Sequence, residues 1–354
     1  MMFVNRFVGT AIGRVVFAAL LLVGVGRAWS NTAEGGEPKP AEMAPLATQA
    51  QINDLAAAGQ AMVAVGERGI ILRSDDGVEW TQVQSPVDSM LNAVYFVDDD
   101  RGWAVGHDAS ILGTTDGGIS WTVQAYGPRG SDPFMDVFFA DQRKGYAIGA
   151  YGLFRITADG GKTWADLADP ALSERAAHMN AMLRLGDGSF ALVGEAGLVA
   201  TSPDAHAWTV LAEPYEGSLY AAVAVGAHGL LAVGMRGNAF EVADLRDPQW
   251  QVVETGTDKS LFGLAQLNET RFVAAAGSGA ALVVLESVRD PVSLPVPVEA
   301  GGQEPPKRDP VPLPAPVEPG LEQSTVFTAL LFWKGQLYAA TDRGIHRIAV
   351  PGGR

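Results

Sequence analysis

The chain has 354 residues, among which 42 are glycine, 21 are proline and none is cysteine. With 47% hydrophobic and 18% charged residues, it has ample material for a core and many turns, which excludes a mostly disordered chain and a coiled coil. The lack of cysteine excludes a disulfide framework, a thiolate metal site and a cysteine nucleophile. A formal net charge of −15 argues against nucleic acid and anionic membrane surfaces as partners.

The first 30 residues have the layout of a secretory signal peptide. Arg6 and Arg14 precede an apolar run of 11 residues over 15–25, and small residues occupy the −3 and −1 positions before a cut after Ser30. The run is shorter than the roughly 20 residues that a membrane-spanning helix needs; an uncleaved anchor is the alternative. We therefore expect a periplasmic or secreted protein whose residues 31–45 form a flexible lead-in.

A motif that ends in tryptophan recurs at steps of 41 to 44 residues. SDDGVEW at 74–80 is followed by TTDGGISW at 114–121, TADGGKTW at 157–164, the degraded TSPDAHAW at 201–208 and a last trace, LRDPQW, at 245–250. A second marker, an apolar segment ending in Val-Gly or a relative of it, has the same period and occurs seven times. The period predicts seven similar structural units.

Each unit favours four short antiparallel strands. In the second unit the strands are expected at Leu91–Phe96, Trp103–Gly106, Ser110–Thr114 and Trp121–Val123, which are rich in β-branched and aromatic residues and bounded by Gly and Asp. Repeated seven times, this pattern predicts an all-β fold, a seven-bladed β-propeller that spans residues 46–350 as a single domain. The last unit supplies three strands, so we expect Pro45–Gln49 to add its fourth and close the ring.

A proline-dense insertion at 291–319 takes the place of the sixth unit's Asp motif and fourth strand. Such a segment would sample the extended polyproline II conformation. Two interpretations are open: a mobile linker, or a strap that docks on a partner.

The residues of the Asp motif are predicted to be structural: Asp75, Asp116, Asp159, Trp80, Trp121 and Trp164. The aspartates can accept hydrogen bonds from the N–H groups of their turns, and the tryptophans can pack against the neighbouring sheet. General acid–base chemistry needs two carboxylates within about 5–10 Å of each other. These aspartates belong to different blades, so no catalytic residue is expected among them.

The intact motif TADGGKTW at 157–164 is an Asp-box, the bacterial neuraminidase repeat. The stretch GWAVGHDASILGTTDGGISW at 102–121 resembles the photosystem II stability and assembly factor family, a group of seven-bladed propellers. The resemblance covers about residues 50–350, with specific motifs over roughly 50–210. It implies a non-enzymatic scaffold that binds a membrane-protein assembly on the exported side. We further expect a monomer without cofactor, whose partner is a membrane-protein complex or an envelope transporter component.

Two other functions remain open. A glycan-active Asp-box enzyme or lectin of the sialidase type would need an arginine cluster and a Tyr/Glu nucleophile pair, and no Arg-Ile-Pro motif precedes the first Asp-box. The other is a structural module whose partner contact is the proline-rich insertion. The histidines lack metal-ligand spacing, so no metal is expected.

A candidate partner-binding face is formed by the turns between the second and third strands of each unit, opposite the Asp-box turns. A turn of this kind needs only small residues, Asn or Gly, so larger side chains there indicate recognition. The alternative is a solvated polar rim without a partner. The candidate residues are Arg68, His107, Tyr151, Arg236 and Arg343.

Overall fold

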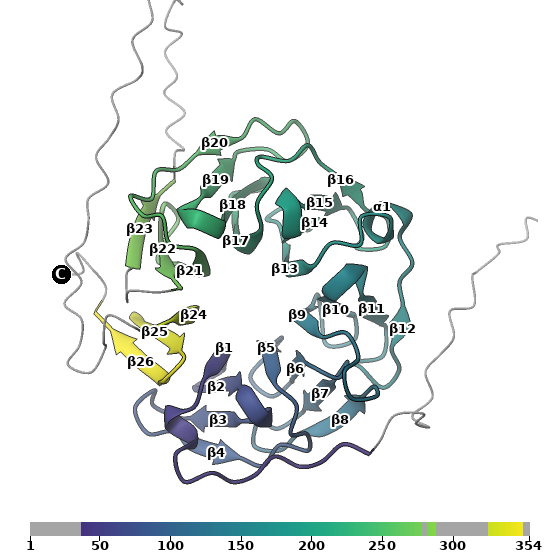
Figure 1. Ribbon diagram of the computed structural model, residues 1–354, viewed down its shortest axis with the longest axis vertical. Helices are drawn as coiled ribbons and strands as arrows, with labels where there is room; N and C mark the ends of the chain where they lie inside the picture. The colour runs from purple at the N-terminus through teal and green to yellow at the C-terminus, as the bar shows by residue number, and fades with distance from the viewer. Residues whose placement is uncertain (1–36, 278–281, 288–324, 350–354) are drawn as a thin grey trace, which may run out of the picture.

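The computed structural model describes residues 37–277, 282–287 and 325–349. Within these ranges the chain forms seven antiparallel sheets arranged as blades around a central axis (Figure 1). The seven-bladed all-β propeller is thereby confirmed. The proposed signal peptide, residues 31–36 and the insertion at 291–319 lie outside the described residues. In the part of the chain that is described, no helix has the length and apolar character to cross a membrane.

The first five blades have four strands each, ordered from the axis outward. Blades one and two contain β1 (Ile52–Ala58), β2 (Ala61–Gly66), β3 (Ile71–Ser74), β4 (Thr81–Val83), β5 (Leu91–Phe96), β6 (Gly102–Gly106), β7 (Ile111–Thr114) and β8 (Thr122–Ala125). Blades three and four contain β9 (Phe134–Phe139), β10 (Gly145–Gly149), β11 (Phe154–Thr157), β12 (Ala165–Asp166), β13 (Met179–Arg184), β14 (Phe190–Gly194), β15 (Val199–Ser202) and β16 (Thr209–Val210).

Blade five contains β17 (Leu219–Val225), β18 (Gly229–Gly234), β19 (Ala239–Val242) and β20 (Gln251–Val252). Three strands are described for blade six, β21 (Leu261–Gln266), β22 (Arg271–Ala276) and β23 (Leu282–Glu286), and three for blade seven, β24 (Phe327–Trp333), β25 (Gln336–Thr341) and β26 (Gly344–Ile348). The helical pieces are η1 (Ala47–Gln49), η2 (Glu67–Gly69), η3 (Ala150–Gly152), α1 (Pro170–Ser173), η4 (Glu195–Gly197) and η5 (Met235–Gly237).

The core lies between the blades. The second strand of a blade is enclosed by its own sheet on both sides and by neighbouring blades on both faces, so β2, β6, β10, β14 and β18 are buried at every residue. Their sequences are continuous apolar runs such as AMVAVG, as expected for a strand buried on both faces.

The Asp-box tryptophans fill the interface with the preceding blade. Trp121, Trp164 and Trp208 are 6%, 3% and 5% exposed, and each belongs to an apolar cluster shared by two blades. Trp80 is half-buried against residues of blades one and seven. Each box therefore joins a turn of one blade to the sheet of the blade before it.

Side chains on the innermost strands also link the blades. Asn53 Nδ2 donates to Leu91 O at 2.8 Å, and Asn92 Nδ2 donates to Phe134 O at 2.7 Å, in each case from one inner strand to the next. Thr328 Oγ1 donates to Ile52 O at 2.6 Å. This last bond joins blade seven to blade one across the ends of the chain.

The N-terminal segment closes the ring in a different way from that expected. Residues 45–49 form a turn and η1 instead of a strand, and η1 packs against β26 and β4. Pro45 lacks the N–H that a strand ladder requires, which accounts for the failed prediction. Ala41 N donates to Ser85 O at 3.0 Å and Ala44 N to Gln82 Oε1 at 2.8 Å, so this end of the expected flexible lead-in is tied to blade one.

Candidate functional site

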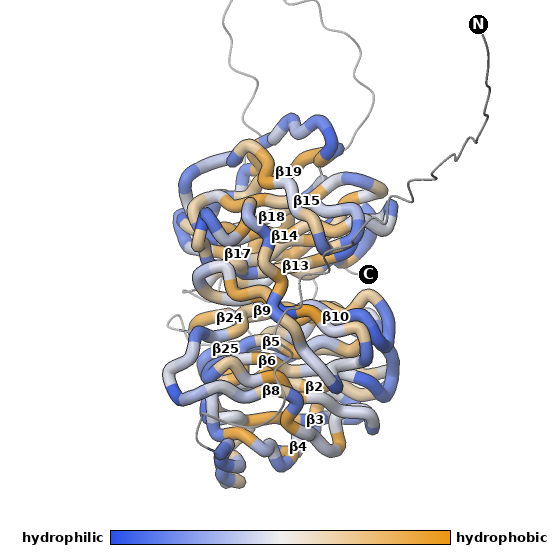
Figure 2. Tube along the Cα trace, turned by 90° about the vertical axis from the view of Figure 1, so that its right-hand side faces the viewer, coloured by the Kyte–Doolittle hydropathy of each residue, from blue (hydrophilic) through white to orange (hydrophobic). Residues whose placement is uncertain are grey.

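Hydrogen bonds define two faces of the ring. On one face, here the Asp-box face, the Asp-box turns contact the hairpins that join first and second strands: Gly117 N donates to Asp100 O and Gly160 N to Arg143 O, both at 2.9 Å. On the other face, here the linker face, the turns between second and third strands contact the connections between blades. For example, His107 N donates to Met90 O at 2.9 Å. In side view, hydrophilic loops border the apolar strands (Figure 2).

The predicted recognition residues are all exposed and lie in linker-face turns. Arg68, Tyr151 and Arg236 occupy the middle of η2, η3 and η5, with φ values of 53°, 53° and 58°. In blade two the corresponding position is held by Asp108, with φ of 55°, and His107 lies one residue before it. Arg343 lies in the tight turn between β25 and β26. Three of the five residues thus share one backbone position, and the other two do not.

That shared position is left-handed, which costs a residue other than glycine about 1–2 kcal/mol. In η4 the same position is held by Ala196, with φ of 51°, so the turn forms without any long side chain. Arg68, Tyr151 and Arg236 therefore carry more than the turn requires.

These side chains are available for contact. The side chains of Arg68 and Arg236 make no hydrogen bond or ion pair with any described residue, and that of Tyr151 is 64% exposed. The Tyr151 ring lies edge-on to His178, with 4.7 Å between ring centroids. Two unpaired guanidinium groups and an exposed phenol suit recognition of an acidic or carbonyl-rich surface.

Asp108, beside His107, is a structural residue. Its carboxylate accepts hydrogen bonds from Ser89 Oγ at 2.5 Å and Gly130 N at 2.7 Å. Burial by itself would raise the pKa of Asp108, but these bonds and the nearby Arg129 outweigh burial and lower it. Within the described ranges, no three His, Asp or Glu side chains come together as a metal site would require.

The Asp-box aspartates hold their own turns. Asp116 Oδ1 accepts from Ser120 N, and Asp159 Oδ1 from Thr163 N, each at 2.9 Å. The second oxygen of each aspartate accepts from the hydroxyl of the same partner, at 2.5 Å and 2.7 Å. Both carboxylates are thus occupied by backbone and hydroxyl donors.

In the first box this role belongs to Asp76 and not to Asp75, which corrects the sequence assignment. Asp76 Oδ1 accepts from Val78 N at 2.8 Å and Glu79 N at 2.9 Å. The deciding feature is the spacing from the preceding hydroxyl, because Asp76 lies two residues after Ser74 as Asp116 lies two residues after its threonine.

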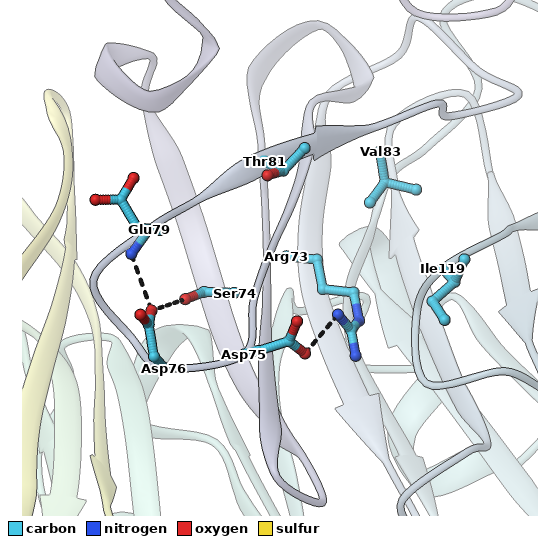
Figure 3. A pocket seen from close by; sticks show the side chains of 8 residues that line it. All are labelled: Arg73, Ser74, Asp75, Asp76, Glu79, Thr81, Val83 and Ile119. Atoms are coloured by element: carbon cyan, nitrogen blue, oxygen red, sulfur yellow. Dashed lines mark hydrogen bonds and ion pairs between the residues drawn. The ribbon is translucent and has the colours of Figure 1, made fainter.

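A pocket of about 370 Å³ lies beside the first box (Figure 3). Arg73 spans it, with Nη1 2.7 Å from Asp75 Oδ1 and Nε donating to Gly117 O in blade two at 2.9 Å. Asp75 points to Arg73 and Asp76 to its own turn, so the two carboxylates do not converge on one point. The arrangement fastens blade one to blade two and offers no acid–base pair.

Sequence reasoning missed two aspartates on the inner strands, Asp54 in β1 and Asp136 in β9. Each bridges two blades: Asp54 accepts from Leu55 N and from Val94 N, at 2.8 and 2.9 Å, and Asp136 accepts in the same way from Val137 N and Met182 N, both at 2.8 Å. Burial of the carboxyl raises the pKa of Asp54 to about 7, with a further contribution from the charge of Asp136.

Burial likewise raises the pKa of Asp136 to about 6. Both residues lie on innermost strands and are half-buried as whole residues. A signal for both aspartates exists in the sequence, because the equivalent inner-strand residue of the other five blades is alanine or glycine: Ala93, Ala181, Ala221, Gly263 and Ala329.

The fold and the repeated turns define the class of protein as an Asp-box β-propeller in which the boxes are structural. The family model described as photosynthesis system II assembly factor YCF48 matches residues 76–286. The chain belongs to this family. Membership supports a role in binding or assembly.

Solved structures agree on the fold. A structure described as YCF48 bound to D1 peptide has a TM-score of 0.62 at 20% identity, and the match covers 90% of this chain and 99% of that one. YCF48 from Cyanidioschyzon merolae has a TM-score of 0.61 at 17% identity, covering 88% and 98%. The WD40 propeller domain of Doa1 has a TM-score of 0.58 at 13% identity, covering 88% and 96%. Among curated proteins no significant match was found.

Proposed function

We propose that this chain is an exported, non-enzymatic propeller that serves as a binding and assembly or accessory factor for a membrane-protein complex, and that it uses the linker face. One observation carries the proposal: Arg68, Tyr151 and Arg236 occupy a left-handed turn position at which Ala196 suffices for the fold. Long, exposed side chains held in a costly backbone conformation are typical of functional sites.

The family supports the same view. It is named for an assembly factor, and one solved relative is described with a bound D1 peptide. We extend peptide binding to this chain. Its partner would present an acidic segment, because the contact residues include the two unpaired cations Arg68 and Arg236 on a protein with 40 acidic and 25 basic residues. Such complementarity chiefly sets specificity and the rate of association.

The location of the partner in this proposal depends on the proposed signal peptide. Cleavage after Ser30 would place the propeller in the periplasm or outside the cell, where it would meet the exported surface of a membrane complex. N-terminal sequencing of the protein recovered from the envelope fraction tests this step. A mature chain that begins at Asn31 is expected, whereas an intact leader on a soluble cytosolic protein would contradict it.

Charge reversal tests the face. We expect Arg68→Glu combined with Arg236→Glu to abolish capture of the envelope partner by the tagged protein, because both changes place a carboxylate opposite an acidic segment. The matched control is Arg143→Glu with Lys162→Glu, which reverses the same number of charges on the Asp-box face and should leave capture unchanged. Capture by the first variant at the level of the wild-type protein would reject the proposal.

The proline-rich insertion is the remaining rival contact. Deletion of residues 291–319 should leave capture intact if the linker face alone binds. If the deletion abolishes capture and the Arg68→Glu, Arg236→Glu variant retains it, the insertion and not the linker face makes the contact.

A further inference from the structure

A second cleft lies on the Asp-box face, between blades two and three. Its volume is about 560 Å³, within the range of small-molecule sites. The cleft is bounded by the β5–β6 and β9–β10 hairpins and by the Asp-box turns of both blades. It faces away from the linker face, so a ligand bound in it would be independent of the proposed function.

Trp103, on β6, lines this cleft and carries an unused donor. The indole stacks on Phe139 and is 3% exposed, and its Nε1–H has no hydrogen-bond partner among the described residues. By contrast, Trp121 Nε1 donates to Gly118 O at 3.2 Å, and the unpartnered Nε1 of Trp208 belongs to a residue that does not line the cleft. A buried donor left without an acceptor is uncommon in native structures and calls for an explanation.

Cations surround the same cleft. Arg143 and Lys162 line it, both are exposed, and neither side chain has a hydrogen bond or ion pair with a described residue. Arg101 also lines it and donates to Gln142 Oε1 at 2.6 Å. Two carboxylates also line the cleft, those of Asp100 and Asp159, and that of Asp159 is occupied by its own turn. The groups available to a ligand are therefore two cations without an ion pair and one N–H donor, against the single unoccupied carboxylate of Asp100.

We propose that this cleft binds a small oxyanion, a carboxylate or phosphate group of a soluble ligand. One oxygen accepts from Trp103 Nε1, directly or through a water molecule, and the charge is balanced by Arg143 and Lys162. Hydrogen bonds and ion pairs to charged oxygens are the strong ones, and this cleft combines both kinds of partner.

The neighbouring cleft shows why the site falls between blades two and three. Between blades three and four, Tyr146 replaces Trp103, the volume falls to about 280 Å³, and the basic residues are Lys144 and His206. That cleft lacks the unpaired indole and the pair of permanent cations. It serves as an internal control.

The experiment is a titration of the full-length mature protein with inorganic phosphate and, separately, with glucuronate, followed by tryptophan fluorescence and calorimetry. We expect at least one probe to bind; phosphate alone would identify a phosphate ligand, and glucuronate alone a carboxylate. Trp103→Phe keeps the stacked ring and removes the N–H, so it should weaken binding about tenfold. Lys162→Gln should weaken it about fivefold, and Lys144→Gln in the neighbouring cleft should have no effect.

The proposal is overturned if neither probe binds the wild-type protein, or if Trp103→Phe and Lys162→Gln bind as tightly as wild type. If Trp103→Phe does not fold, the test uses the two exposed cations instead. The double variant Arg143→Gln with Lys162→Gln should abolish binding of the probe, and unchanged binding would reject the site. Thermal unfolding of each variant separates loss of the site from loss of the fold.

Discussion

The two faces of the ring differ in what their polar side chains do. On the Asp-box face, both carboxylate oxygens of Asp116 and of Asp159 accept hydrogen bonds from their own turns. Trp121 and Trp164 are buried in the apolar interfaces between blades. On the linker face, Arg68 and Arg236 bond to no described side chain or backbone atom through their guanidinium groups. The repeated motif therefore stabilises the ring, and recognition falls to positions that the motif does not include.

The buried Asp-box tryptophans and the exposed linker-face residues should differ most in their contribution to stability. Trp164→Ala should lower the free energy of unfolding by about 3–5 kcal/mol, because it opens a cavity between blades two and three. Tyr151→Ala, on the linker face, should change it by less than about 0.5 kcal/mol. Urea denaturation measures both. Similar losses in the two variants would contradict the division of roles.

The two adjacent aspartates of the first Asp-box should contribute unequally to stability. Asp76→Ala removes the acceptor of two turn N–H groups and should lower the free energy of unfolding more than Asp75→Ala does. Asp75→Ala removes only an exposed ion pair with Arg73 and should cost less than about 1 kcal/mol. Equal destabilisation in denaturant would show that the two aspartates share the role.

The inner strands add a dependence on pH. Unfolded, Asp54 and Asp136 ionise near pH 3.8, whereas folded they keep their protons up to pKa values of about 7 and about 6. At pH values between the unfolded and the folded pKa, the folded state binds more protons than the unfolded state. The free energy of unfolding should therefore rise as the pH falls from about 8 to about 5. The double variant Asp54→Asn with Asp136→Asn should flatten that rise. Thermal unfolding across the pH series checks it, and an unchanged slope would count against buried, protonated carboxyls.

The smallest effect concerns the left-handed turns. Arg68→Gly relieves an unfavourable backbone conformation but adds entropy to the unfolded chain, so stability should change by no more than about 1 kcal/mol in either direction. Binding of the partner should nevertheless weaken. A variant that loses stability by several kcal/mol and keeps its binding would reverse the roles of structure and recognition at this position.

The sequence predicts the blades well because strand and turn chemistry is local. Leu91–Phe96 is found as predicted, and the other strands of that blade differ by at most two residues at either end. The predicted closure of the ring is wrong, since closure depends on whether Pro45 can join a ladder formed with residues about 300 positions away.

The candidate site is only partly predictable for a similar reason. The turn residues can be aligned from the repeat, but the shift that places Asp108 instead of His107 at the left-handed position requires backbone angles. Asp54 and Asp136 escape prediction because their partners, Val94 and Met182, belong to the next blade. A position-by-position comparison of inner strands, in which only these two blades carry a carboxylate, is the pattern that would find them.

A photo-cross-linking amino acid placed at position 151 or at position 162, in otherwise wild-type protein expressed in its host, would show which face of the ring contacts the partner. The side chain at 151 lies on the linker face and that at 162 on the Asp-box face, and both are exposed. We predict that irradiation joins an envelope protein to the chain from position 151 and not from position 162. A cross-link to a protein partner from position 162 alone would contradict this division between the two faces.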